Sequence, residues 1–230
     1  MLTRACCLTI AWAIVVIGIT YPAPARSEQR EEPVLLVAAS YPGASASVVA
    51  DTIAAPIEQQ INGIERMVRI ESTSRNDGAY TASVYFKPKT DPESAMKLVQ
   101  TRVALAEPVL PDVVRRNKVS VKVGKAKPNP NKVAIAVIDR GDNGWKILQK
   151  SASAVVKRLA AEGALTKPQV FPRDEKQVYR VDLVPAIRIT GAPAEGKSVA
   201  ATAAKCIELT EAEMMRLGSR GFAVVNLSAK

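Results

Sequence analysis

The order of the apolar patterns along the chain predicts an α+β fold of two ferredoxin-like (split βαβ) subdomains. Segments with strand and helix periodicity follow one another as strand, helix, strand, strand, helix, strand over residues 33–124. Asn76-Asp77-Gly78 joins the two middle strands as a hairpin, because these residues tolerate positive φ. From residue 132 the first half of the same order begins again, so we expect a pseudo-repeat.

The first strand and the first helix have clear local signals. Residues 34–41 (VLLVAASY) are a short apolar run that the Pro42-Gly43 turn ends, which is typical of a buried strand. Residues 45–61 carry apolar side chains at helical spacing. Ser45 or Ser47 supplies the N-cap of this helix, and a glycine shortly after residue 61 ends it.

The remaining elements of the first subdomain follow in order. Residues 67–74 and 79–86 alternate apolar and polar side chains, as two strands do. Asp91-Pro92 starts the second helix, since Asp is a favoured N-cap and Pro a favoured first helical residue. This helix runs to about Val109, and residues 119–123 form the last strand.

A linker rich in Pro and Asn, residues 125–131, separates the second subdomain from the first. We assign the second subdomain to residues 132–185, with a strand at 133–138, a helix at about 145–161 and strands at 169–171 and 178–183. Residues 186–230 are left as an unassigned C-terminal extension, in which 199–204 and 211–217 have helix-like patterns and 222–227 has a strand-like pattern.

The composition excludes several kinds of catalytic site. The chain of 230 residues has no histidine, so Ser-His-Asp catalysis, Cys-His catalysis and His-ligated zinc are excluded. No carboxylate pair or metal-ligand cluster stands out, and we expect neither a cofactor, a metal nor an enzyme. The 32 Lys and Arg exceed the 22 Asp and Glu, but the net charge of +10 is spread along the chain. No nucleic-acid partner is expected, because aromatic residues do not interleave with the basic ones.

Residues 1–25 predict export from the cytoplasm. A basic opening, an uncharged run over residues 5–20 and an Ala23-x-Ala25 cleavage pattern together describe a signal peptide. The alternative is a retained first transmembrane helix that associates with the membrane through residues 5–21, although spanning a bilayer takes about 20 residues. The two alternatives place the protein in the periplasm, or on an inner-membrane anchor that faces it.

A series of short motifs follows one another between residues 41 and 114. They are Tyr41-Pro42-Gly43-Ala44, Pro56-Ile57-Glu58, Ile61-Asn62-Gly63-Ile64, Thr90-Asp91-Pro92, Val99-Gln100-x-Arg102-Val103 and Leu110-Pro111. Their order and spacing resemble the porter domain of resistance–nodulation–division (RND) efflux permeases of the acriflavine-resistance type. A weaker match continues over residues 133–139 and 169–181.

This resemblance implies that three copies assemble around an axis and that the helix starting at Asp91-Pro92 is the pore helix. Glu93, Lys97 and Thr101 match its axis face at positions i, i+4 and i+8. Lys97 departs from the uncharged or apolar residue that is usual there, and Glu93 is placed to pair with it. The family usually has a glycine before the last strand, where we expect Asn117 to supply the left-handed turn.

Phe171 is the candidate substrate contact. By the same resemblance it matches an aromatic residue of the drug pocket, and the alternative is that it packs in the core. The implied ligands are small apolar or amphipathic molecules bound in a cleft between the subdomains.

Residues 191–198 (GAPAEGKS) match the phosphate-binding pattern G-x-x-x-x-G-K-[ST]. In a nucleotide site, the loop at Gly196 would cradle phosphates, Lys197 would contact the β and γ oxygens, and Ser198 would bind magnesium. The stretch after Ser198 is too short for the parallel sheet that such a site requires. We therefore favour a connection rich in Gly and Pro.

The expected function is that of an RND porter-domain-like protein, truncated or stand-alone, that contributes to substrate binding or to pump assembly in the efflux of small apolar compounds. Its expected partners are further copies in a homotrimer or an RND pump. We do not expect it to transport alone, because no intramembrane ionisable residue is present to carry a proton. The alternatives are an exported structural module that oligomerises without a ligand, and an exported P-loop nucleotide binder.

Overall fold

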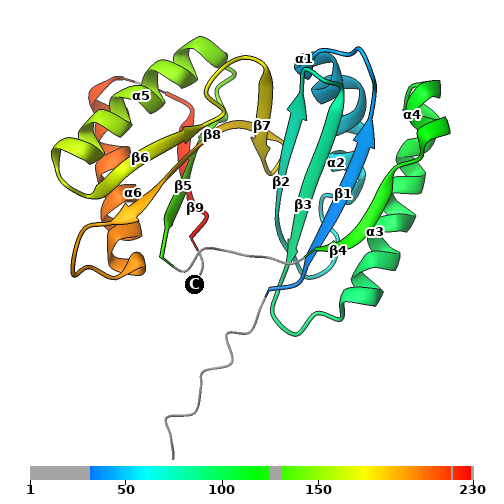
Figure 1. The fold of residues 1–230 in the computed structure, drawn as a ribbon, viewed down its shortest axis with the longest axis horizontal. Helices are drawn as coiled ribbons and strands as arrows, with labels where there is room; N and C mark the ends of the chain where they lie inside the picture. Colours follow the sequence, from blue (N-terminus) through cyan, green and yellow to red (C-terminus); the bar gives the residue numbers. More distant parts are fainter. Residues whose placement is uncertain (1–31, 125–130, 219, 229–230) are drawn as a thin grey trace, which may run out of the picture.

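Residues 34–124 fold in the order of strands and helices that the sequence predicts (Figure 1). The structure is a computed structural model and describes residues 32–124, 131–218 and 220–228. The elements of this first subdomain are β1 (Val34–Ser40), α1 (Ala46–Val49), a π-helical turn (Ala50–Ala54), α2 (Ala55–Ile61), β2 (Met67–Arg75), β3 (Ala79–Phe86), α3 (Pro92–Ala106), a 3₁₀ turn (Glu107–Val109), α4 (Asp112–Asn117) and β4 (Ser120–Gly124).

The sheet of the first subdomain has the strand order β4-β1-β3-β2, and every neighbouring pair is antiparallel. This order, with a helix after the first strand and another after the third, defines the split βαβ arrangement. One face of the sheet packs on the helices around a largely aliphatic core that includes Leu35, Val37, Ile53, Ile57, Tyr80, Val84, Phe86 and Val99. The predicted α+β class is confirmed.

The second subdomain repeats the same order and extends further along the chain than the sequence analysis assigned. Its elements are β5 (Val133–Asp139), α5 (Trp145–Ala161), β6 (Leu165–Phe171), β8 (Val184–Pro193), α6 (Val199–Arg216) and β9 (Phe222–Asn226), with the strand order β9-β5-β8-β6. The boundary drawn after residue 185 falls inside β8, and residues 186–226 complete the sheet. Residues 186–190 have a strand-like pattern, but Pro185 and Pro193 interrupt the apolar pattern of β8 and so hid its full length, although Ile187 and Ile189 are fully buried.

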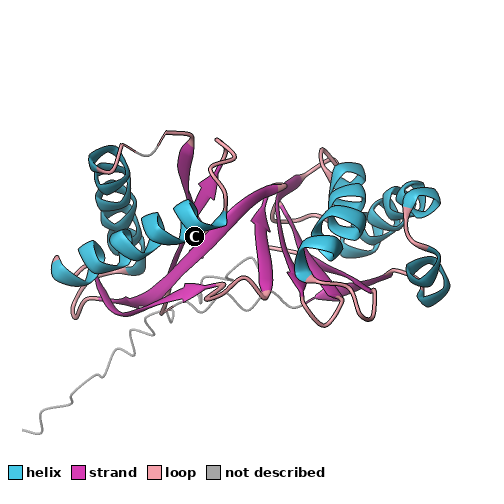
Figure 2. Cartoon of the chain, turned by 90° about the horizontal axis from the view of Figure 1, so that it is seen from above, coloured by secondary structure: helices cyan, strands magenta, loops and turns pink. Residues whose placement is uncertain are grey.

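An additional strand, β7 (Gln177–Val181), joins the two sheets. It pairs with β2 from Glu71↔Val181 to Arg75↔Gln177, and a two-residue turn connects it to β8. Both turn residues, Asp182 and Leu183, have positive φ, as the tight turns of hairpins require. Leu183 packs against the core of the first subdomain. The nine strands of the described residues thus form one sheet, and Figure 2 shows the helices as two groups towards its two ends.

The local capping signals agree with the structure, whereas one turn residue differs. The Ser45 hydroxyl accepts a hydrogen bond from the Val48 amide at 3.4 Å, and the Asp91 carboxylate accepts one from the Ser94 amide at 2.8 Å. The left-handed residue before β4 is Lys118, with φ of 58°, and not Asn117. The reason is α4, which the sequence did not predict: it keeps Asn117 helical, so the chain turns one residue later.

No helix within the described residues is both long and apolar enough to cross a membrane. The signal peptide or anchor predicted at residues 1–25 lies outside the described residues.

Candidate functional site

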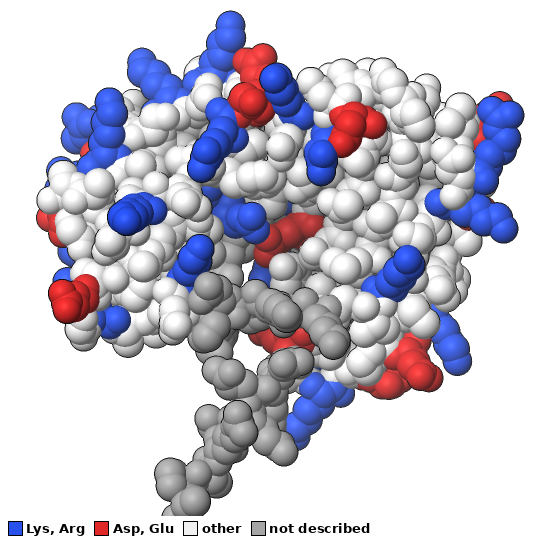
Figure 3. Space-filling view, in the orientation of Figure 1, with Lys and Arg blue, Asp and Glu red and all other residues white. Residues whose placement is uncertain are grey.

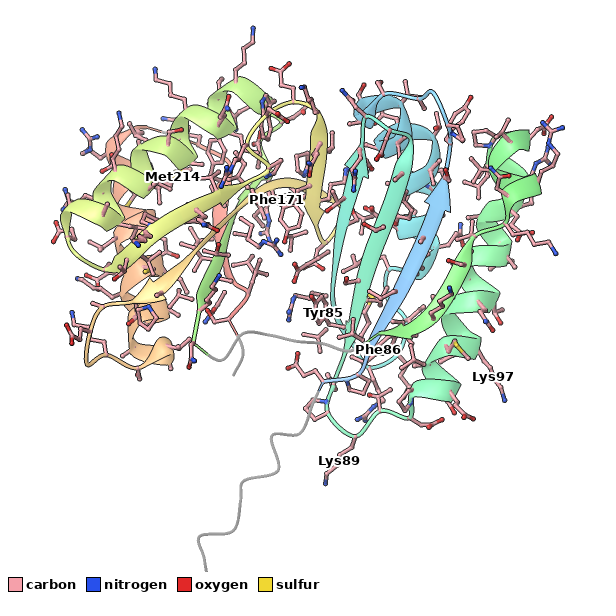
Figure 4. All side chains as sticks on the ribbon, viewed as in Figure 1. Tyr85, Phe86, Lys89, Lys97, Phe171 and Met214 are labelled. Carbon is pink, nitrogen blue, oxygen red and sulfur yellow. The ribbon has the colours of Figure 1, made fainter. Side chains whose placement is uncertain are left out.

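Phe171 is the last residue of β6 and is half-buried on the sheet face opposite α5 and α6. Its ring packs edge-to-face against Tyr179 of β7, with 5.7 Å between the ring centroids and 76° between the planes. Figure 4 shows Phe171 in the middle of the molecule, where the two subdomains meet. It therefore contributes to an apolar cluster and borders the space between the subdomains, while its contact with a substrate stays a prediction.

Charged side chains from both subdomains surround Glu71 of β2. Glu71 Oε1 accepts a hydrogen bond from Arg69 Nε at 2.9 Å, and Oε2 accepts one from the Tyr179 hydroxyl at 2.8 Å. Arg188 of β8 places Nη1 3.7 Å from the same Oε2. The guanidinium carbon of Arg188 also lies 5.2 Å from the ring centroid of Phe171 and 5.4 Å from that of Tyr179, within cation–π range.

Tyr85 of β3 completes this group, which we call the Glu71 cluster: Arg69, Glu71, Tyr85, Phe171, Tyr179 and Arg188. The guanidinium carbon of Arg69 lies 3.7 Å from the ring centroid of Tyr85. Burial and then the charge of Glu71 raise the pKa of Tyr85 and of Tyr179, so both phenols stay neutral. Burial acts to lower the pKa of Arg69, but the hydrogen bond and charge of Glu71, together with the charges of Tyr85 and Glu32, outweigh burial and raise that pKa.

The surface between the two subdomains is hollowed, and Figure 3 shows acidic and basic side chains inside this hollow. Arg188 keeps 36% of its side chain exposed, whereas Glu71 and Tyr179 are buried, so Arg188 is a member of the cluster that solvent reaches. Aromatic rings beside guanidinium groups bind amphipathic molecules through stacking and charge.

The opposite face of β7 contacts a second buried carboxylate. Glu58 of α2 is fully buried, with the Tyr80 hydroxyl 3.5 Å from Oε1 and Arg180 Nη1 3.9 Å from Oε2. Arg180 also donates a hydrogen bond to the carbonyl of Ala50, the first residue of the π-helical turn, at 3.2 Å. Burial raises the pKa of Glu58, against the opposing effects of Ser72, Arg180 and Tyr80. β7 therefore holds the two subdomains together from both of its faces.

Glu93, Lys97 and Thr101 lie along the exposed side of α3, as one stripe. Figure 4 shows Lys97 pointing away from the second subdomain. The Thr101 hydroxyl donates to the carbonyl of Lys97 at 2.9 Å, which is a contact within the helix. The expected Glu93–Lys97 ion pair does not form within 4.0 Å, and both residues are exposed.

Gly196, Lys197 and Ser198 lie between β8 and α6, at the exposed surface. The Lys197 amide donates to the Ala194 carbonyl at 3.1 Å, and the Ser198 hydroxyl accepts a hydrogen bond from the Ala201 amide at 3.2 Å as the N-cap of α6. β8 is antiparallel to its partners β5, β6 and β7. Nucleotide binding by these three residues stays a prediction.

In the parts of the chain that the structure describes, no three His, Cys, Asp or Glu side chains are grouped in a way that could hold a metal ion.

Sequence reasoning identified Phe171 and missed the other members of its cluster. Arg69 and Glu71 are adjacent on one strand face, and such alternation of charges on an expected core strand was a usable signal. Tyr179 and Arg188 had no comparable signal, because their contact with Glu71 depends on the pairing of β7 with β2.

The fold is consistent with a porter-like α+β domain, and comparisons with known proteins agree with this class. A family model described as the AcrB/AcrD/AcrF family matches residues 28–159, more than half of the 230 residues. The chain belongs to this family of RND efflux transporters and is an efflux-pump-related protein.

Three similar proteins have names that describe efflux, multidrug export or multidrug resistance. The toluene efflux pump membrane transporter TtgB of Pseudomonas putida is 40% identical over 97 residues, which cover 42% of this chain and 9% of TtgB. The multidrug export protein AcrF of Escherichia coli K12 is 41% identical over 90 residues, covering 39% of this chain and 9% of AcrF. The multidrug resistance protein MdtF of the same strain is 30% identical over 171 residues, covering 70% of this chain and 16% of MdtF. The chain thus matches less than one fifth of the length of each relative.

Proposed function

We propose that this protein binds small apolar or amphipathic compounds at the Glu71 cluster and so contributes to their efflux, without catalysing a reaction and without transporting them alone. The observation that carries the proposal is the half-buried Phe171 ring, which lies beside Arg188 and Tyr179 where the two subdomains meet. The relatives named for toluene efflux and multidrug export support a ligand of this class. The proposed location is the periplasm, either free or on an inner-membrane anchor.

A fluorescent hydrophobic dye such as Nile red tests this proposal. The full chain should bind the dye, and Phe171→Ala should weaken binding by roughly tenfold, since a buried aromatic contact contributes about 1.5 kcal/mol or more. Phe222→Ala is the matched control, because Phe222 packs on the helix-facing side of the same sheet. Equal weakening by both substitutions, or no dye binding by the unaltered protein, would contradict the proposal.

A second candidate function is assembly into a trimer through α3. Leu98 and Leu105 of this helix and Val109 after it keep 48%, 58% and 68% of their surfaces exposed, which is unusual for large apolar side chains so close together. Burial of this face between copies would remove it from water, with Lys97 near the axis.

Size-exclusion chromatography with light scattering tests the assembly. A trimer should dissociate on Lys97→Glu, because Glu93 lies one turn away and only negative charges would then line the axis side of α3. Lys132→Glu makes the same charge change at an exposed position outside α3 and should leave the mass unchanged. A monomer at all concentrations refutes assembly through α3 and leaves dye binding as a separate question.

A further inference from the structure

An open groove of about 860 Å³ runs between α5 and α6, on the side of the second subdomain that faces away from the Glu71 cluster. It is lined by Lys146, Gln149, Lys150, Ser153, Ala154, Lys157, Arg158, Ala161, Glu213 and Arg216. The groove contains none of the residues assigned to the proposed function.

Three lysines of α5 give the groove an uncompensated positive charge. Lys146, Lys150 and Lys157 are exposed, and no carboxylate of the described residues lies within 4.0 Å of their ammonium groups. Figure 3 shows basic side chains gathered over the part of the surface that α5 occupies. Like charges at i, i+4 on a helix repel one another, so an anion bound between Lys146 and Lys150 would relieve this repulsion.

The two arginines of the groove are already neutralised. Arg158 pairs with Glu162 at 3.0 Å, and Arg216 pairs with Glu213 at 2.5 Å through Nη2. The hydrogen bond and charge of Arg216 hold the pKa of Glu213 below its usual value, so this carboxylate stays ionised and paired. The free charge of the groove is therefore the row of lysines.

The shape of the groove selects among anionic partners. A rise of 1.5 Å per residue places Lys146 and Lys157 about 16 Å apart along α5, with Lys150 between them. Ser153, Ala154 and Ala161 are small, so a second backbone can approach the helix closely beside this row. A linear row of cations beside a concave floor matches a rod-shaped anion better than a flat bilayer surface.

We propose that this groove binds an acidic α-helical segment of a partner protein, whose carboxylates at i, i+4 and i+11 pair with Lys146, Lys150 and Lys157. Such a segment needs about 12 residues, or three helical turns, to span the row. Surface ion pairs of this kind are screened by salt, so binding should weaken as the ionic strength rises.

The test measures fluorescence anisotropy of a labelled Glu/Ala helical peptide of about 14 residues with the full chain, at about 50 mM salt. Lys150→Glu/Lys157→Glu should weaken binding at least tenfold, because two attractive pairs become repulsive. The control pair Lys87→Glu/Lys132→Glu changes the net charge equally at exposed positions outside the groove and should weaken binding less than threefold. Circular dichroism confirms that both variants fold.

A peptide with Gln in place of Glu should not bind. Vesicles containing about one third phosphatidylglycerol should bind less tightly than the acidic peptide. Equal weakening by the two variant pairs would show a net-charge effect and overturn the proposal. The proposal would also be overturned by a second combination of results: the unaltered protein binds vesicles but not the peptide, and the groove variant loses binding to vesicles. The groove would then be a membrane-binding surface.

Discussion

Replacing Tyr179 by Phe removes one hydroxyl group from the Glu71 cluster and leaves the ring in place. This hydroxyl donates to Glu71 Oε2 at 2.8 Å, whereas Arg188 Nη1, 3.7 Å from the same oxygen, is too far to take over the hydrogen bond. A hydrogen bond to a charged group contributes about 1.5–3 kcal/mol. We expect Tyr179→Phe to lower the free energy of unfolding by about this amount, because β7 then loses a polar contact with β2.

Urea denaturation followed by far-UV circular dichroism at pH 7 measures this loss, with the m-value expected to stay constant. Tyr41→Phe is the matched control: the Tyr41 hydroxyl has no hydrogen-bond partner among the described residues, so its removal should change stability by less than about 0.5 kcal/mol. A double-mutant cycle with Glu71→Gln isolates the pair. A loss no larger than that of the control, or a coupling energy near zero, would refute the assignment of this contact as a link between the subdomains.

Three further predictions concern the interior. Burial raises the pKa of Glu58 above 4.5, so the folded state holds this proton more tightly than the unfolded state. The stability of the unaltered protein relative to Glu58→Gln, measured in urea titrations, should therefore fall as pH rises from 4.5 through the folded pKa. A stability difference that rises with pH would contradict this. Gly78→Ala should lower Tm more than Gly43→Ala. Both glycines have positive φ, but only at Gly78 would an added Cβ lie 1.9 Å from the Tyr41 carbonyl oxygen. Equal Tm values for the two variants would contradict this clash. Cys206 is fully buried and its pKa is raised to about 11, so at pH 8 its thiol should react with a thiol reagent only after urea unfolding. The Cys206→Ser variant measures the reaction of the other cysteines, which is subtracted. Fast reaction of Cys206 in the native protein would contradict its burial.

Much of the fold could be predicted because its signals are local. The Asp91-Pro92 start of α3 and the hairpin turn ending at Gly78 each depend on residues within one turn, and both lie where the sequence places them. The predicted span of α5, residues 145–161, also agrees with the structure. The resemblance to RND permeases implied the stripe of Glu93, Lys97 and Thr101, and the three residues lie on the exposed side of α3.

The C-terminal part of the second subdomain was harder to assign, because its apolar pattern is interrupted. Pro185 and Pro193 at the two ends of β8 divide a strand that only its pairing with β5 defines. The two helix-like stretches at 199–204 and 211–217 are parts of one helix, α6, whose buried face includes polar residues such as Thr210 and Glu213. Polar side chains on the buried face weakened the periodicity from which a single helix would have been inferred.

By itself, the sequence determined the α+β class, the order of strands and helices in the first subdomain, and the resemblance to RND permeases, because periodicity, caps and turns act over a few residues. Only the tertiary structure decided that β7 joins the two sheets and that the Glu71 cluster forms. Glu71 and Tyr179 are 108 residues apart in the chain, and their hydrogen bond requires the register of β2 on β7. Strand register between distant segments depends on how the side chains of both subdomains pack together, which no local pattern specifies.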